Sequence, residues 1–348
     1  MASIIRAVCE ENLIVSTPLP SPFLRKKYLG QLSGSKQPSI WTSSSLDPYV
    51  NLSIEEYLFR KVEVDRPILL IYRNRKSVII GRNQNPWQES NLEELERQGI
   101  SLVRRRSGGG TVYHDEGNTN YSIMLPRDQF ERRTNARLVA NAVQEMSIDR
   151  VNVTDRYDVC VGDRKVSGSA FRITAKRAYH HGTMLISSNL AQLKGALRPT
   201  PNMNIVDSKA VGSVRSPVTS LVDSVTNDIN HHSFVQHLCR AFSKHYYPCL
   251  DHPINPQIID EHELKKNDFV RAGYEELKSW DWIFGQTPQF TRVFEIQRDD
   301  QTGLIPVQVT YKNGAIIEIK IDDHLLQTDS SIQQKISSRF SLGDRIDF

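Results

Sequence analysis

The sequence predicts an α+β fold, in which helices flank a mainly antiparallel, mixed sheet. Short apolar runs follow one another with few polar residues between them, which is the spacing of sequential antiparallel strands. Amphipathic helical segments are interspersed among these runs and do not alternate with single strands, so a βαβ architecture is disfavoured. No G-x-G-x-x-G opens a helix after the first strand and no G-x-x-x-x-G-K-S/T occurs, which disfavours dinucleotide-binding and P-loop folds.

The composition is ordinary for a globular protein of two domains. The chain has 348 residues, of which 39% are hydrophobic and 24% are charged. A net charge of +4 is too small to indicate nucleic-acid binding, and no apolar stretch is long enough to span a bilayer. We therefore expect neither a nucleic-acid nor a membrane partner. The cysteines form no C-x-x-C pair, so they indicate neither a disulfide framework nor a structural metal site, and metal ligands stay unknown.

Residues 1–38 differ from the rest of the chain. They are basic, rich in serine and proline, and contain only Glu10 and Glu11 as acids. This composition is typical of a mitochondrial transit peptide, and a disordered cytosolic tail has a similar one. We predict a transit peptide and a mitochondrial location, with a cytoplasmic location as the alternative.

A main domain is predicted over residues 39–247, with helices assigned from apolar residues at helical spacing and strands from alternation or short apolar runs. Asn51 or Ser53 is expected to cap the first helix, because Ser53 and Glu56 have capping-box spacing. In chain order, the expected elements are a helix from about 51 to 58, a β-hairpin of 68–72 and 78–80, a short helix near 92–95, an antiparallel pair of 100–106 and 111–125, a helix near 133–147, strands at 157–161, 164–170 and 179–186, and a helix within 231–247.

A smaller C-terminal domain is predicted over residues 261–348. The segment 248–260 contains three prolines and is interpreted as a linker. Beyond it we expect a helix near 262–277 and a hairpin that turns at Asn313-Gly314, a dipeptide typical of type I′ turns.

The segment 104–115 combines three arginines with three glycines. Consecutive glycines let a ligand lie against backbone N–H groups, and guanidinium groups bind oxyanions in bidentate fashion. The segment therefore indicates an anion site, although a flexible hairpin loop beside a solvated charge run explains the pattern equally well. Arg104 and Arg106 share a strand face with Ile100 and Leu102, and a buried arginine is expected to need an anionic partner.

Lys165 lies on a predicted strand directly after the tight turn at Gly162-Asp163. Alternation places Lys165, Ser167 and Ser169 on one face, where small side chains leave room for a ligand. An ammonium in this place could neutralise a carboxylate and a phosphate oxygen together, as an adenylating reaction requires. A solvated strand lysine is the simpler alternative for Lys165 taken alone.

Seven segments, in the same order along the chain, resemble the lipoate–protein ligase A family. They are G-R-N-Q-N-P-W at 81–87, R-R-x-S-G-G-G-T-V-Y-H-D at 104–115, G-N-T-N at 117–120, D-R-K-V-S-G-S-A at 163–170, Y-H-H-G-T at 179–183, S-V-R-S-P-V-T at 213–219 and W-D-W-I-F-G-Q-T-P at 280–288. The resemblance extends from about Trp41 into the C-terminal unit and leaves out residues 1–38.

The resemblance implies a fold, a reaction and its partners. The fold is a catalytic domain like those of biotin–protein ligases and class II aminoacyl-tRNA synthetases, here residues 39–247, with a small accessory domain. In the reaction, lipoate and ATP give lipoyl-AMP and pyrophosphate with Mg²⁺, and a lysine of a lipoyl domain then attacks lipoyl-AMP and releases AMP. The implied acceptors are the lipoyl domains of 2-oxoacid dehydrogenase E2 subunits and the glycine-cleavage H protein.

The resemblance also implies roles for individual residues. Lys165 is the residue placed between the lipoate carboxylate and the α-phosphate, and it is the implied catalytic residue. The implied ATP and lipoyl-AMP contacts are Arg105, Ser107, Gly109, Gly110, Thr111, Val112, Tyr113 and Lys165. Arg82 and Gly109 join Lys165 as implied lipoate contacts. Asp158 lies on the predicted strand before Lys165 and has two interpretations of equal weight. It contacts the acceptor amine, Lys165 or Mg²⁺, or it is an ordinary acidic residue at the end of a strand.

Three residues are left out of the catalytic set, and two alternative functions stay open. His180 and His181 are interpreted as structural groups, and Cys160, between two valines, as packing and not as a nucleophile. Within the family, the alternative function is a lipoyltransferase that uses preformed lipoyl-AMP or protein-bound lipoyl groups without its own adenylation. From another class, the alternative is a noncatalytic module that binds RNA through Arg104–Arg106 and Arg73–Lys76.

Overall fold

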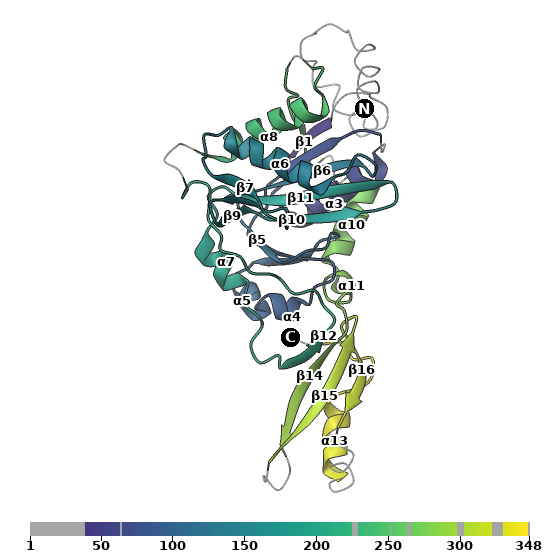
Figure 1. The fold of residues 1–348 in the computed structure, drawn as a ribbon. Helices are drawn as coiled ribbons and strands as arrows, with labels where there is room; N and C mark the ends of the chain where they lie inside the picture. The colour runs from purple at the N-terminus through teal and green to yellow at the C-terminus, as the bar shows by residue number, and fades with distance from the viewer. Residues whose placement is uncertain are drawn as a thin grey trace.

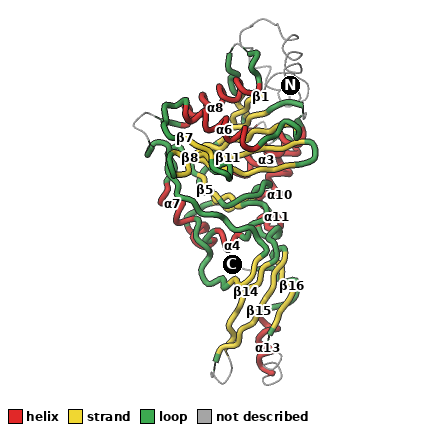
Figure 2. Tube along the Cα trace, in the orientation of Figure 1, coloured by secondary structure: helices red, strands yellow, loops and turns green. Residues whose placement is uncertain are grey.

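The computed structural model describes residues 39–62, 65–224, 229–250, 252–262, 266–297, 303–321 and 330–346 (Figure 1). The predicted transit peptide, residues 1–38, lies outside these ranges. The described elements form an elongated molecule, in which helices and three sheets make up one end and a further sheet with a helix makes up the other, as the secondary-structure colours of Figure 2 also show. Among the described residues, no helix is both long and apolar enough to cross a bilayer.

The largest sheet has six strands and mixes parallel and antiparallel pairs. Its strands, in spatial order, are β10 (Ser169–Ile173), β11 (Arg177–Leu185), β6 (Asn118–Pro126), β2 (Ile68–Tyr72), β1 (Ser39–Ser43) and β13 (Gln257–Ile259). The pairs from β10 to β2 are antiparallel, and β1 pairs parallel with both of its neighbours. The predicted α+β fold with a mainly antiparallel, mixed sheet is confirmed.

Helices cover this sheet and bury its apolar side chains. The helices α6 (Arg132–Gln144) and α8 (His231–Tyr246) pack on one face, where Leu138, Phe234 and Phe242 join the largest apolar cluster (Figure 1). The helix α3 (Pro48–Lys61) places Ile54 and Leu58 against β2 and Tyr179. Burial of each such side chain contributes about 1.5–3 kcal/mol.

The first helix begins earlier than predicted. Asp47 caps α3 by accepting a hydrogen bond from the backbone N–H of Tyr49, and Pro48 occupies the first helical position. Ser53 instead donates to the carbonyl of Tyr49, one turn back within the helix. The predicted caps Asn51 and Ser53 were therefore wrong, because an equally good cap–proline pair stands four residues upstream of Asn51.

A second, three-stranded sheet overturns the two strand pairings predicted within residues 68–80 and 100–125. The strand β3 (Ser77–Ile80) does not form a hairpin with β2 but lies at the centre of a second sheet. There β4 (Ser101–Arg104) pairs with it in parallel and β5 (Val112–His114) in antiparallel fashion. The glycine segment thus connects the two edge strands across the end of β3. Both β2 and β3 are buried throughout, so their sequences carry no alternation that could reveal which strand they pair with.

The strand that carries Lys165 is shorter than predicted. A third sheet consists of β7 (Val151–Val153), β8 (Val159–Val161) and β9 (Arg164–Ser167), and the predicted turn at Gly162 joins the last two. The strand β9 ends before Gly168, and after this residue the chain enters β10 of the six-stranded sheet. Residues 164–170 therefore belong to two sheets, and the predicted alternation does not continue through Gly168.

The C-terminal region packs against the rest of the molecule. Its sheet orders β12 (Ile205–Ser208), β14 (Phe290–Gln297), β15 (Leu304–Lys312) and β16 (Ala315–Lys320), next to α13 (Ser330–Arg339). The β15–β16 turn at Asn313-Gly314 is confirmed, with φ of 53° and 73°. Phe290 packs with Trp87 of α4 (Pro86–Glu89), in one apolar cluster that also contains residues of β3, β15 and the short helix α5 (Leu92–Arg97).

The predicted linker and accessory domain also contribute to the larger end. Within 248–260, β13 pairs with β1. The helix α10 (Asp268–Lys278), which realises the helix predicted near 262–277, packs against α3, and α11 (Trp280–Ile283) follows it (Figure 1). The division of the chain at residue 261 stays a prediction.

Candidate active site

A cavity of about 310 Å³ opens where three sheets meet. It is lined by Tyr72, Asn120 and His181 from the six-stranded sheet, Ile79 and Val112 from the sheet of β3, and Lys165 from β9. The glycine segment and residues 211–214 close it on other sides. Among its lining residues, Arg105, Arg156 and Lys165 are cationic and Asp158 carries the single carboxylate. The excess of positive charge suits an anionic ligand.

The glycine segment approaches its neighbours more closely than other residues could. Gly109 has a φ of +87°, and a Cβ there would lie 3.0 Å from Nη2 of Arg105 and 3.3 Å from Cβ of Ala170. A Cβ on Gly81 would lie 2.1 Å from the carbonyl oxygen of Gly109. The two glycines allow the end of β3 and the loop to touch backbone to backbone, with Gly109 at the cavity wall.

Arg105 organises this loop from within. Its guanidinium lies at the cavity wall but is only 3% exposed. Nη2 donates to the carbonyls of Gly108 and Gly110 at 2.6 and 2.7 Å, and Nη1 donates to the carbonyl of Ile79 at 3.0 Å. Burial lowers the pKa of Arg105 to about 10, so this side chain stays charged at neutral pH. The sequence indicated an arginine that binds a ligand directly, and the structure shows one whose guanidinium binds the carbonyls of the glycine loop.

The other two arginines are bound within the protein. Arg104 is fully buried and donates to the carbonyls of Gly81, Arg82, Gln84 and Ile283 and to the hydroxyl of Thr287. The prediction that Arg104 needs an anionic partner is therefore wrong, because carbonyl oxygens and a hydroxyl accept its hydrogen bonds instead. Arg106 pairs with Glu276 and lies over the ring of Trp282.

Lys165 lies at the cavity and forms an ion pair with Asp158. Its Nζ is 2.9 Å from Oδ2 of Asp158, and the other carboxylate oxygen accepts from the backbone N–H of Ser169 at 3.0 Å. A Cβ on Gly168 would lie 3.3 Å from the same Nζ, so this glycine leaves the space that the lysine occupies. The break at Gly168 brings Gly168, Ser169 and Ala170 to the cavity with Lys165, whereas Ser167 is buried behind it and bonds to Tyr121.

The backbone of Lys165 is held by a segment to which sequence reasoning gave no role. Its N–H donates to the carbonyl of Pro217, and its carbonyl accepts from Thr219. A few residues earlier, Ser213 accepts from the N–H of Thr111 at 2.8 Å and itself donates to Glu89. The segment 213–219 thereby joins the glycine loop to the lysine strand. Its resemblance motif was the only sequence signal that pointed to it.

A neutral donor pair also lines the cavity. Asn51 donates to Oδ1 of Asn74, so the amide of Asn74 donates to Nδ1 of His114 at 2.9 Å. Because Nδ1 of His114 accepts, the ring hydrogen lies on Nε2. Neither Nε2 of His114 nor Nδ2 of Asn120 has a hydrogen-bond partner among the described residues. Burial lowers the pKa of His114 to about 3. Sequence reasoning gave neither residue a role, although His114 stands in the motif at 104–115 and Asn120 in the motif at 117–120.

The remaining sequence-predicted residues have the following places. Gly110, Thr111 and Val112 line the cavity with Lys165, Arg105 and Gly109. Ser107 is buried behind the wall, and Tyr113 turns away and donates to Gln192. Arg82 does not line the cavity: it donates to Gln286 and lies over the ring of Trp282. The roles implied for these residues stay predictions.

His180, His181 and Cys160 are all buried. His180 bonds to Ser169, and His181 lines the cavity while bonding to Glu55 and Ser107. Burial raises the pKa of the Cys160 thiol, which is 6% exposed and pairs across the sheet with Lys165. A protonated thiol is a poor nucleophile, in keeping with the packing role expected for Cys160.

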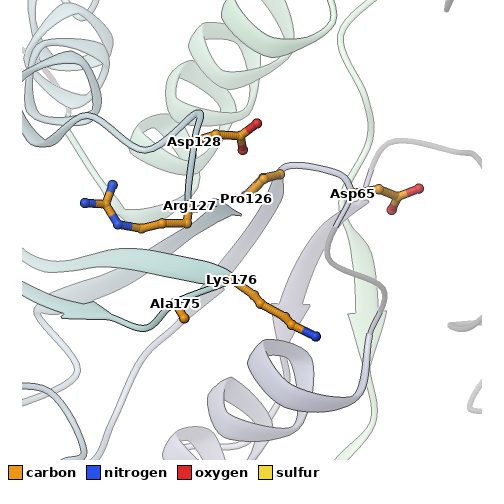
Figure 3. Close-up of a pocket in the computed structure, with 6 residues that line it drawn as sticks. All are labelled: Asp65, Pro126, Arg127, Asp128, Ala175 and Lys176. Atoms are coloured by element: carbon orange, nitrogen blue, oxygen red, sulfur yellow. The ribbon is translucent and has the colours of Figure 1, made fainter.

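A second hollow lies at the surface beside β6 and the β10–β11 turn. Figure 3 shows its lining side chains, among them Arg127, Asp128 and Lys176, which point away from one another and outward. Nothing converges there on a common point, so this hollow offers no chemistry comparable to that around Lys165. No cluster of three His, Cys, Asp or Glu side chains suited to a metal ion occurs in the described part of the chain.

Comparison with known proteins agrees with this geometry. Residues 47–243 match the family described as the lipoyl protein ligase A/B catalytic domain. The chain is 36% identical to lipoate-protein ligase A of Psychrobacter cryohalolentis over 292 residues, which are 83% of this chain and 84% of that protein. It is 31% identical to lipoate-protein ligase A of Bdellovibrio bacteriovorus over 313 residues, 88% of this chain and 89% of that protein.

Solved structures are similar as well. LipL1 of P. falciparum, in complex with lipoate, has a TM-score of 0.64 and 27% identity, over 88% of this chain and 96% of that one. A bipartite lipoate protein ligase from Thermoplasma acidophilum, studied with its E2 lipoyl domain, has a TM-score of 0.57 and 26% identity, over 71% of this chain and 96% of that one. In sequence and in fold, then, the chain is similar to proteins that attach lipoate.

Proposed function

The chain belongs to the lipoyl protein ligase A/B family and is a lipoate–protein ligase, and from this premise we propose that it works through lipoyl-AMP, formed at the cavity around Lys165. A lipoate carboxylate oxygen attacks the α-phosphorus of ATP, and pyrophosphate leaves. The amine of an acceptor lysine then attacks the acyl carbon of lipoyl-AMP, and AMP leaves. The proposal rests on one observation, that the ammonium of Lys165 and the glycine loop line the same cavity.

Lys165 supplies positive charge where two anions must meet. The attack of a carboxylate on the α-phosphorus of ATP builds charge on the phosphoryl oxygens, and a fixed ammonium stabilises that charge. The Asp158 carboxylate, 2.9 Å away, holds the ammonium in place until the substrates enter. After adenylation, the acyl phosphate bond already has a good leaving group, so the second step needs no strong base.

The glycine loop would receive the phosphates of ATP. Gly109 and Gly110 line the cavity, where their backbone N–H groups would meet phosphate oxygens, and Arg105 holds the carbonyls of Gly108 and Gly110. Mg²⁺ would neutralise the pyrophosphate that leaves, and Asp158 is the carboxylate at the cavity that could hold it together with phosphate oxygens and water. If so, Asp158→Asn should raise the Mg²⁺ concentration needed for half-maximal activity, whereas an unchanged Mg²⁺ requirement would remove Asp158 from this role.

The acceptors are lipoyl domains. Among them we propose the lipoyl domains of 2-oxoacid dehydrogenase E2 subunits and the glycine-cleavage H protein. Incubation of each purified acceptor with the protein, ATP and lipoate, followed by intact-mass measurement, tests them one by one. An acceptor whose target lysine gains no lipoyl mass is not a substrate.

We further propose that residues 1–38 direct the protein to mitochondria. The support is their basic, acid-poor composition. A fusion of residues 1–38 to a fluorescent reporter should enter mitochondria, and a reporter that stays in the cytosol would refute the proposal.

Pyrophosphate exchange separates adenylation from transfer. With lipoate, ATP and labelled pyrophosphate, the protein should return label to ATP, and omission of lipoate should stop the exchange. A lipoyltransferase without its own adenylation activity would show no exchange and would still transfer from synthetic lipoyl-AMP, an outcome that would overturn the leading proposal.

A further inference from the structure

Four buried side chains form a continuous hydrogen-bonded chain that ends at the glycine loop. Glu55 of α3 lies 3.0 Å from Nδ1 of His181 on β11, and Nε2 of His181 lies 2.9 Å from the hydroxyl of Ser107. The same hydroxyl accepts from Nε of Arg105 at 3.0 Å. Each of the four is at most 8% exposed.

Hydrogen bonds fix the orientation of each group in this chain. Burial disfavours the charged form of Glu55, but contacts with His181, Ser122 and Tyr179 together lower the pKa of this carboxyl, which is therefore ionised and accepts the Nδ1 hydrogen. Nε2 of His181 and the hydroxyl of Ser107 form the next hydrogen bond. Because Arg105 donates to Ser107, all three groups between Glu55 and the loop have fixed orientations.

The chain also balances charge. Arg105 keeps its positive charge, and Glu55 is the negative charge at the other end, with His181 and Ser107 between them. An isolated buried charge is costly, so each end of the chain stabilises the charged form of the other. The guanidinium can therefore stay charged behind the loop without a second carboxylate, besides that of Asp158, at the cavity.

Arg105 transmits this order to the loop backbone. It holds the carbonyls of Gly108 and Gly110, and in a planar trans peptide the following N–H points the opposite way. The N–H that follows Gly110 belongs to Thr111 and donates to Ser213. The N–H that follows Gly108 belongs to Gly109, which lines the cavity and has no acceptor among the described residues. This N–H is left for a ligand.

We propose that Glu55, His181 and Ser107 are positioning residues for the adenylation step, which through Arg105 hold the N–H of Gly109 toward an oxygen of the ATP phosphates. The inference rests on the proposed function. It assigns the buried chain to the first half-reaction, because only that step develops charge on phosphate oxygens beside the loop while pyrophosphate leaves. The transfer of a lipoyl group from ready-made lipoyl-AMP depends less on this contact.

The order serine, histidine and acid is also that of hydrolase triads, and the geometry argues against that reading. Ser107 is 1% exposed, so no substrate carbonyl reaches its oxygen. Arg105 donates to that oxygen and so withdraws the electron density that a nucleophile needs. A hydrolase would lose its esterase activity in Ser107→Ala, whereas we expect the wild-type protein to have no serine-dependent esterase activity.

Ser107→Ala tests the proposal, with Ser243→Ala as the matched control. Ser243 is a buried serine on α8, far from the cavity residues in sequence, which donates to the carbonyl of Cys239. Lipoate-dependent ATP–pyrophosphate exchange should fall at least about tenfold in Ser107→Ala, the usual effect of removing a hydrogen bond to a charged group. Transfer from synthetic lipoyl-AMP should fall less than about threefold, and Ser243→Ala should leave both reactions unchanged.

Glu55 provides a second variant pair in case Ser107→Ala does not fold. Glu55→Gln keeps an acceptor for Nδ1 of His181, whereas Glu55→Ala removes it, so the exchange reaction should be recovered in part by glutamine and not by alanine. The positioning role is overturned if both half-reactions fall equally in the folded variants, or if exchange is unchanged. A wild-type protein that shows no exchange would refute the proposed function instead, so the two failures are distinguishable.

Discussion

The ammonium nitrogen of Lys165, on β9, lies 2.9 Å from a carboxylate oxygen of Asp158, the residue directly before the neighbouring strand β8. The pair is partly open to the cavity, with the lysine side chain 24% and the aspartate side chain 11% exposed. An anionic substrate can therefore reach the lysine without breaking a buried ion pair. Asp158 holds the ammonium in position at the cavity, so the contribution of each residue to activity can be measured.

Lys165→Ala should abolish lipoylation of acceptor protein and leave the fold intact. The side chain contributes charge to the cavity and little to the apolar core, so the melting temperature should change by no more than a few degrees. Intact-mass analysis of the acceptor measures the activity, and circular dichroism measures the fold. Lys176→Ala, in the surface hollow of Figure 3, is the control and should keep full activity. Retained lipoylation in Lys165→Ala would overturn the assignment.

Asp158→Asn should lower kcat/KM for lipoylation by about 10- to 100-fold. The change removes a charge-assisted hydrogen bond to Lys165, an interaction typically worth about 1.5–3 kcal/mol. Steady-state rates at saturating acceptor give the number. Asp155→Asn is the matched control, because Asp155 stands in the same turn and its side chain is fully exposed. Equal losses in the two variants would show that the ion pair has no specific role.

Gly109→Ala should impair both stability and exchange, whereas Gly108→Ala should affect neither strongly. At Gly109, alanine must adopt a φ of +87° and place its Cβ 3.0 Å from Arg105, which should cost about 1–3 kcal/mol. At Gly108, the added Cβ has nothing within 4 Å. Urea unfolding and pyrophosphate exchange on the two variants would test the difference. Similar behaviour of the two would mean that the loop conformation is not what matters.

Stability should fall as the pH is lowered below 6.5, in part because of two buried histidines. Burial lowers the pKa of His114 and of His180 to about 3, whereas their unfolded pKa is near 6.5. The stability that they contribute is therefore fully present above pH 6.5 and is lost as the pH falls toward 3. At pH 5 each costs about 2 kcal/mol.

The measurement is the free energy of unfolding in urea at pH 7 and at pH 5. His180→Gln should reduce the difference between the two values, because the variant has one fewer group that takes up a proton on unfolding. His232→Gln, at an exposed position on α8, should leave the difference as it is. A difference that His180→Gln does not change would assign the acid sensitivity to other groups.

The parts of the site that the sequence predicts are those whose chemistry is local. Lys165 stands directly after a turn, with small residues beside it, and the glycines stand together, so a few adjacent letters indicate both. The helices were also readable, because their apolar stripes are set by local periodicity. The cap of α3 was misplaced because two adjacent sets of capping residues compete and only packing decides between them.

The parts that the sequence does not reveal depend on contacts between distant segments. β2 and β3 are buried on both faces, so nothing in their letters says that they enter different sheets. Ser107 and His181 are 74 residues apart, and each reads alone as an ordinary polar residue. Asn120 also reads alone as an ordinary polar residue. Its amide nitrogen without a hydrogen-bond partner indicates a ligand contact only once β6 is known to line the cavity.

The shared apolar cluster between Phe290, Trp87 and their neighbours decides how this chain can be divided. A fragment that ends near residue 247 would keep the cavity residues and yet expose Trp87 and the apolar side chains of β3 to water. Such a fragment would associate with itself or with other apolar surfaces through this exposed face. A separately produced C-terminal fragment would compete with these associations by covering the same face. The two fragments, produced separately, would then associate without a covalent link through the apolar cluster that contains Trp87 and Phe290.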